Sequence, residues 1–142
     1  MQQTNDPGCR LPKSLLDRAI RSGNEFGWRQ TDFLEVVEAA RKEKLAILGG
    51  QVQYILPEGT CELYWLSYDP AERLQNESWL DYCTRTASKT INKFKLLISQ
   101  TNIEREAITN FELLKDKNNS GASISDYLTF ILYFDDSETD NH

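Results

Sequence analysis

The stretch Leu63–Ile98, LYWLSYDPAERLQNESWLDYCTRTASKTINKFKLLI, contains the two periodicities that decide the fold. It begins with an apolar run that is typical of a strand and continues through a polar, acidic loop over residues 69–76. From Ser78 onward, apolar residues recur at every third or fourth position, which predicts a long amphipathic helix lying on a sheet. The stretch also holds two of the three tryptophans.

Two helices are predicted N-terminal to this stretch. The first covers residues 12–22, with Pro12 at an early helical position and Gly23 as its C-terminal stop. A turn is expected over residues 23–28. The second helix covers residues 31–44, because Thr31 is a good N-cap and an apolar stripe follows it.

Three strands are predicted between the helices. Residues 45–48 are apolar and end at a Gly-Gly pair, residues 51–56 alternate in polarity, and residues 62–68 return after a Pro-Glu-Gly-Thr turn. These segments predict a small antiparallel meander.

The C-terminal third is less regular. Residues 102–115 are compatible with either helix or strand, and residues 118–121 are predicted to be a loop. Residues 127–134 are apolar on both faces, which favours a central strand, although a buried helix has the same pattern.

The order α-α-β-β-β-α-(α)-β predicts a single-domain α+β fold, with a small antiparallel or mixed sheet and helices packed on one face. The expected boundaries are a flexible N-terminal arm (1–10), one domain (11–134) and an acidic disordered tail (135–142).

Composition excludes several classes of protein. The formal net charge is −6 over 142 residues, and four of the acidic residues lie among the last eight. An acidic total argues against nucleic-acid binding. The three cysteines have no CxxC spacing, the first eleven residues hold no secretory signal, and no apolar run reaches 18 residues. We therefore expect a cytoplasmic protein that has no membrane segment.

No catalytic pattern is visible. The single histidine is the terminal His142, and neither a phosphate-binding loop nor a metal-ligand cluster occurs, so we predict no enzyme activity, no cofactor and no metal. The abundant carboxylates could still pair in space, although no spacing predicts which ones. The candidates are Glu25, Glu62, Asp69, Glu72, Glu77 and Asp81.

Binding residues are sought among loops, tryptophans and charged faces. Trp65 and Trp79 are predicted to be core residues and Trp28 is left open, while the loop over residues 68–76 is suited to contact and is equally compatible with an ordinary surface connection. The loop at residues 118–120 has the same two interpretations. The predicted partner-binding residues are Trp28, Tyr68, Asp69, Glu72, Glu77 and Asp81.

The basic residues Arg85, Lys89 and Lys93 share one face of the long helix. They could follow a phosphate backbone, which gives an alternative function as a regulatory or nucleic-acid-binding module. A solvated face opposite the apolar stripe is the favoured interpretation, because neighbouring segments are acidic and no aromatic residue interrupts the stripe.

Over residues 15–98 the chain resembles an immunity-protein family of bacterial polymorphic-toxin and contact-dependent growth inhibition systems. The matching pieces are Gly23-Asn24-Glu25 with Gly27-Trp28, the run that ends in Gly49-Gly50, and Glu77-Ser78-Trp79 followed by Tyr82 and Arg85.

The resemblance implies a small, non-catalytic cytosolic protein, a monomer or weak dimer on its own. Such a protein would bind the C-terminal domain of a cognate toxin, often a basic nuclease, and block it. The shared motif is expected to be structural, since the toxin-facing surface must vary with the partner.

Overall fold

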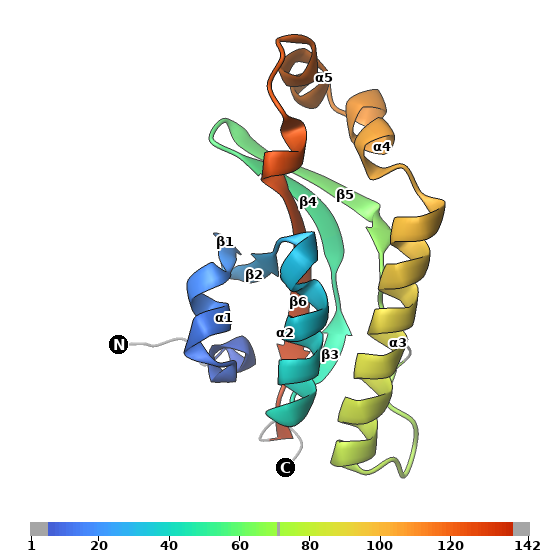
Figure 1. Cartoon of the computed structure of the whole chain (residues 1–142). Helices are drawn as coiled ribbons and strands as arrows, with labels where there is room; N and C mark the ends of the chain where they lie inside the picture. The colour runs from blue at the N-terminus through green and yellow to red at the C-terminus, as the bar shows by residue number, and fades with distance from the viewer. Residues whose placement is uncertain (1–5, 71, 138–142) are drawn as a thin grey trace.

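The computed structural model describes residues 6–70 and 72–137, and a curled antiparallel sheet forms its centre (Figure 1). Its strand order is β1-β2-β6-β4-β5, with β3 also paired to β6. The strands are β1 (Ile20–Ser22), β2 (Glu25–Trp28), β3 (Ala46–Gly49), β4 (Gln51–Leu56), β5 (Gly59–Ser67) and β6 (Leu128–Asp135).

The last strand, β6, lies in the middle of the sheet. On one side it pairs with β2, where Trp28 faces Phe130. On the other side it pairs first with β4, where Val52 also faces Phe130, and then with β3, where Ile47 faces Phe134. β3 and β4 therefore act as one long strand that bends at Gly50.

The helices α1, α2 and α3 pack on one face of this sheet (Figure 1). Ser78 caps α3 by accepting a hydrogen bond from the Asp81 amide at 3.1 Å, which explains where this long helix begins. The helical segments are η1 (Pro7–Arg10), α1 (Lys13–Arg18), α2 (Gln30–Lys42), α3 (Trp79–Gln100), α4 (Ile103–Asn110), α5 (Glu112–Asn119) and η2 (Ile124–Tyr127).

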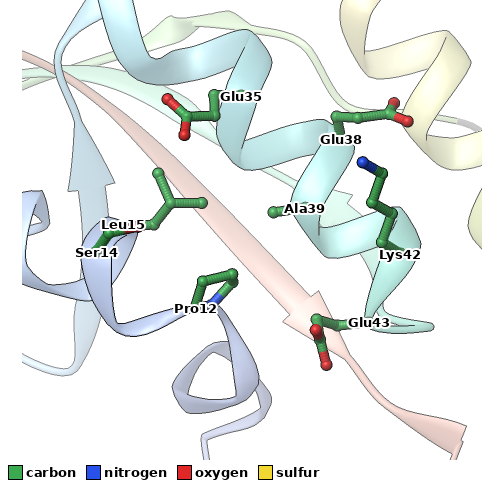
Figure 2. A pocket seen from close by; sticks show the side chains of 8 residues that line it. All are labelled: Pro12, Ser14, Leu15, Glu35, Glu38, Ala39, Lys42 and Glu43. Carbon is green, nitrogen blue, oxygen red and sulfur yellow. The ribbon is translucent and has the colours of Figure 1, made fainter.

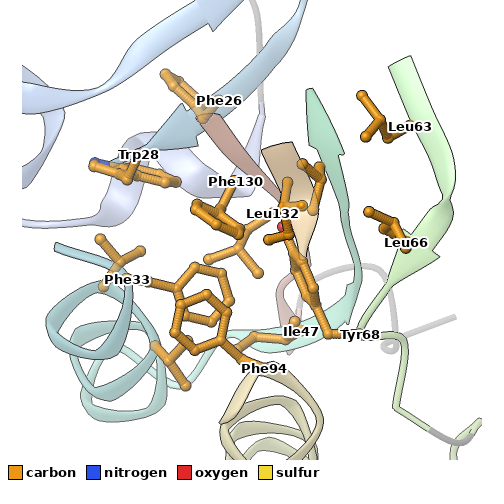
Figure 3. Packing of buried hydrophobic residues seen from close by; sticks show 14 of the residues in the cluster. Phe26, Trp28, Phe33, Ile47, Leu63, Leu66, Tyr68, Phe94, Phe130 and Leu132 are labelled. Atoms are coloured by element: carbon orange, nitrogen blue, oxygen red, sulfur yellow. The ribbon is translucent and has the colours of Figure 1, made fainter. Parts of the chain in front are cut away.

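Aromatic rings fill the space between α2, α3 and the sheet (Figure 3). The Phe33 ring of α2 stacks on the Phe94 ring of α3, with 3.9 Å between centroids. Both rings meet Phe130 of β6 edge-on, at 5.9 and 5.2 Å. Edge-to-face and stacked aromatic pairs add to the stabilisation that burial gives, so this cluster joins both helices to the central strand.

The α+β prediction is confirmed, and so are the helix beginning after Ser78 and the central strand near residues 127–134. The predicted meander is right only for the β4–β5 hairpin, because β3 pairs with β6 and not with β4. The open segment 102–115 is largely helical and contains α4 and the first half of α5.

The predicted helix over residues 12–22 is wrong in its second half. It ends at Arg18, and residues 20–28 form the β1–β2 hairpin instead of a helix end and a turn. Ala19 and Ile20 continue the apolar stripe of the helix in the sequence, so the pattern did not indicate that β1 begins at Ile20. The chain reverses at Gly23, whose φ of +62° suits a residue without a side chain.

The N-terminal residues 7–10 lie inside the predicted arm, yet they form η1 with a buried Gly8. At the other end, Asp136 is largely buried and lies 3.8 Å from Arg10. The predicted arm and tail fall partly on residues 1–5 and 138–142, outside the described residues.

We expect Phe94→Ala to lower the free energy of unfolding by about 3–5 kcal/mol, because it removes a ring stacked between two helices and the sheet. Leu96→Ala, two residues along the same helix, should cost less than about 1 kcal/mol since Leu96 is exposed. Urea unfolding of both variants checks this. Equal losses would contradict the assigned core.

Candidate partner-binding site

The bend between β3 and β4 uses two of the predicted partner-binding residues. The Tyr68 hydroxyl lies 2.6 Å from the carbonyl oxygen of Ile131 and 3.1 Å from that of Gln51. The Asp69 carboxylate accepts a hydrogen bond from the Gly50 amide at 2.9 Å. These groups satisfy backbone polar atoms where the ladder to β6 is interrupted.

Gly50 is required at this bend because of close packing. A Cβ atom there would lie 1.9 Å from the Ile131 carbonyl oxygen and 2.6 Å from the Tyr68 ring. The Gly-Gly pair and the Tyr68-Asp69 pair are therefore two halves of one structural unit. Tyr68 is fully buried, and its hydroxyl serves the fold at this bend.

Glu77 forms the centre of a second structural unit, before α3. Its two carboxylate oxygens accept hydrogen bonds from the Arg85 guanidinium at 2.7 and 2.8 Å, and one of them also accepts from the Leu74 amide at 3.0 Å. Arg85 donates as well to the Glu72 carbonyl oxygen at 2.8 Å. The loop is thereby tied to the first two turns of α3.

The hydrogen bonds from Arg85 are the main cause that lowers the pKa of Glu77 from 4.5 to about 2, with the Leu74 amide adding to the effect. The Arg73 guanidinium lies over the rings of Trp79 and Tyr82, at 5.3 and 5.6 Å from their centroids. The pair of Arg85 with Glu77 is charge-assisted and bidentate, and a pair of this kind fixes the geometry of a loop. The Glu77 side chain is thus engaged within the protein, where it holds the loop before α3.

The tryptophans differ from the prediction. Trp28, which the sequence left open, is fully buried in the core and donates to the Leu15 carbonyl oxygen at 2.8 Å. Trp65, predicted to be core, is 39% exposed, stacks on Phe111 and donates to Glu106 at 2.9 Å. Trp79 is partly buried in a small cluster beside the main core and donates to the Lys44 carbonyl oxygen at 2.8 Å.

The remaining candidates from the sequence are exposed. Glu72 and Asp81 lie at the surface beside the N-terminus of α3, and Asp69 is exposed although one of its oxygens is bonded. The structure thus brings Glu72, Glu77 and Asp81 to one end of α3. Trp28 lies elsewhere, in the core.

The basic stripe on α3 does not form a free surface. Arg85 is bound to Glu77, and the Lys93 ammonium donates to the Asp69 carbonyl oxygen at 2.6 Å. Two of the three side chains that a phosphate-binding face would need are therefore occupied.

A cleft of about 320 Å³ lies between α1 and α2 (Figure 2). Two of its acidic residues are already paired, Glu35 with Arg18 and Glu38 with Arg41. Paired surface carboxylates lack the convergent geometry of an acid–base site. The residues that line the cleft are Pro12, Ser14, Leu15, Glu35, Glu38, Ala39, Lys42 and Glu43.

A polar cluster that sequence reasoning did not single out covers the sheet face opposite the core. Glu25 accepts hydrogen bonds from the Tyr133 hydroxyl at 3.0 Å and from the Gln53 amide at 3.3 Å. The Gln51 amide donates to the Tyr133 hydroxyl at 3.3 Å. Burial and the Glu25 carboxylate raise the pKa of Tyr133 to about 12. The polar alternation of Gln51 and Gln53 in β4 is the only signal in the sequence that points to this face.

Within residues 6–70 and 72–137, no group of three or more His, Cys, Asp or Glu side chains is arranged to hold a metal ion. None of the helices in these ranges combines the length and the apolar character needed to cross a membrane.

Comparison with protein families places the chain among the immunity proteins, the class that counters toxins. The family model of Immunity protein 40 matches residues 14–119, more than half of the chain, and the chain belongs to this family. This confirms the resemblance found in the sequence. The match ends before β6. No curated protein and no solved structure matches the chain.

We expect Tyr68→Phe to lower the free energy of unfolding by about 1–3 kcal/mol, because the buried Ile131 carbonyl oxygen loses the hydroxyl donor that lies 2.6 Å away while the ring packing is kept. Chemical denaturation measures the loss. The variant should still bind any partner of the wild type with unchanged affinity. A variant with the stability of the wild type but without affinity for the partner would show that Tyr68 contacts the partner.

We expect the contribution of Glu77 to stability to depend on pH. The pKa of Glu77 is lower in the folded than in the unfolded protein, so its ion pair stabilises the fold fully above pH 4.5 and less as the pH falls toward about 2. The urea midpoints of wild type and Glu77→Gln should therefore differ most near neutral pH and converge only as the pH approaches about 2. Asp81→Asn serves as the control. A difference that stays constant with pH would contradict the assigned pair.

Proposed function

We propose that this protein binds the toxic domain of a cognate secreted toxin in the cytosol and blocks its activity, so that the producing cell and its siblings are protected. Membership of the Immunity protein 40 family is the observation that carries the proposal. We further propose that the protein acts as a binder without catalysis and that the toxin domain is a nuclease.

The charge of the chain supports a basic partner. The formal net charge is −6, and opposite charge on a partner speeds the encounter of two proteins and helps to select the correct one. Nucleases must approach a polyanion, so their binding surfaces are typically basic. An acidic inhibitor is the complement of such a surface.

The test is co-expression with the toxin domain encoded by the neighbouring gene. Expression of that domain alone should arrest growth, and expression of this chain with it should restore growth. The two proteins should purify as a one-to-one complex. If no neighbouring candidate is neutralised, the proposal is wrong.

An assay of the purified toxin domain on RNA and DNA, with and without this protein, tests the nuclease proposal separately. Nucleic-acid cleavage should fall in proportion to added protein until the two are equimolar. Rescue of growth without any measurable cleavage would keep the immunity function and reject the nuclease assignment.

A further inference from the structure

The sheet has a second face, which we call the far face and which consists of Glu25, Gln51, Gln53, Glu62 and Tyr133 over a base of Thr129 and Ile131. Ile131 is fully buried yet lies outside the main core cluster. A Cβ atom on Gly27 would meet the Thr129 and Ile131 side chains at 2.4 and 2.8 Å, so both lie across that glycine. In Figure 1, α1, α2 and α3 stand in front of the sheet, and this face is turned away from them.

The far face is not built for stability. Gln53 is fully buried, and its Oε1 oxygen has no hydrogen-bond partner among the described residues. A buried acceptor without a partner costs free energy that an apolar side chain of similar size would not cost. Placing this amide beside a carboxylate therefore calls for an explanation other than folding.

Glu25 is held ready to bind a cation. Two donors, from Tyr133 and Gln53, fix its carboxylate in a half-buried position. A carboxylate that is already oriented loses little conformational entropy when a lysine or arginine side chain joins it. The resulting charge-assisted hydrogen bond is stronger than one between neutral groups.

The surrounding charges favour a basic partner. Glu62 faces Gln53 across the β4–β5 pair and is exposed, and its charge contributes to the raised pKa of Tyr133. Arg29 is a basic group at the base of this face, and its guanidinium is used within the protein: it donates to the Leu128 carbonyl oxygen at 2.7 Å and to the Thr129 hydroxyl at 3.4 Å. Within the described strands the only basic residue is Arg21, which lies over the Phe26 ring on the core face.

An exposed aromatic side chain borders the acidic groups. Tyr64 follows the buried Leu63 in β5 and is 72% exposed. Because side chains alternate along a strand, Tyr64 and Glu62 project from the same side, opposite Leu63. Tyrosines at such positions are common anchors of protein interfaces.

We infer that the far face is the surface that binds the toxin domain, with Glu25 and Glu62 receiving lysine or arginine side chains of a basic partner and Tyr64 packing at the border. This inference rests on the proposed function. Acidic groups at the cleft and before α3 fit a basic partner less well, because Glu35, Glu38 and Glu77 are each paired with an arginine of this chain, whereas the donors to Glu25 are neutral.

The experiment compares two double charge reversals that change the net charge equally. Glu25→Lys with Glu62→Lys alters the far face, and Glu112→Lys with Asp116→Lys alters exposed positions of α5. Binding to the toxin domain of the neighbouring gene is measured by calorimetry at moderate salt, and folding of each variant by circular dichroism and urea unfolding. The milder Glu25→Gln and Tyr64→Ala variants are included in case the reversal disturbs the fold.

We expect the far-face reversal to weaken binding by about 100-fold or more, and the α5 reversal by no more than about 3-fold. Glu25→Gln should weaken binding by about 10-fold without lowering the urea midpoint, because it removes only a charge at a site that does not support the fold. If every far-face variant binds the toxin domain as tightly as the wild type does, the inference is overturned and the proposed function stands. A wild-type protein that fails to bind the toxin domain would overturn both.

Discussion

The backbone of β6 is the element on which the rest of the structure depends. Its hydrogen bonds hold β2 on one side and the continuous β3–β4 segment on the other, so these two parts of the sheet are joined only through it. Phe130, for example, faces both Trp28 and Val52. Because these contacts span most of the chain, the sheet can close only when its last strand is in place, and the fold must form cooperatively.

The alternation of side chains along this strand also separates the two faces. Phe130 enters the aromatic core with Phe33 and Phe94, while its neighbours Thr129 and Ile131 point to the far face. A sheet covered by helices on both faces would be apolar on both. Here the flanking strands supply Glu25 and Gln53 to one face only, so stability resides on the helix side and polar chemistry on the other.

Sequence reasoning succeeded where the pattern was long and local. The α3 stripe and its Ser78 cap are read from neighbouring residues, and the alternation in β4 is likewise local. The β1–β2 hairpin was missed because its three-residue strand continues the helical stripe of α1. The internal bonds of the binding candidates could not be predicted, since loop composition cannot reveal that Asp69 is bonded to Gly50 or Glu77 to Arg85. The far face joins Glu25 to Tyr133, a pair 108 residues apart, and no spacing predicts such a contact.

The residues that carry the family resemblance are therefore used inside the molecule. Gly49-Gly50 is locked by Tyr68 and Asp69, and Glu77 with Arg85 fixes the loop before α3. Specificity for one partner requires contacts that differ between relatives, and contacts that maintain the fold cannot vary in that way. A surface that can be altered without loss of stability is the natural place for partner choice. On the described part of this chain, the far face meets that condition better than the motif that identifies the family.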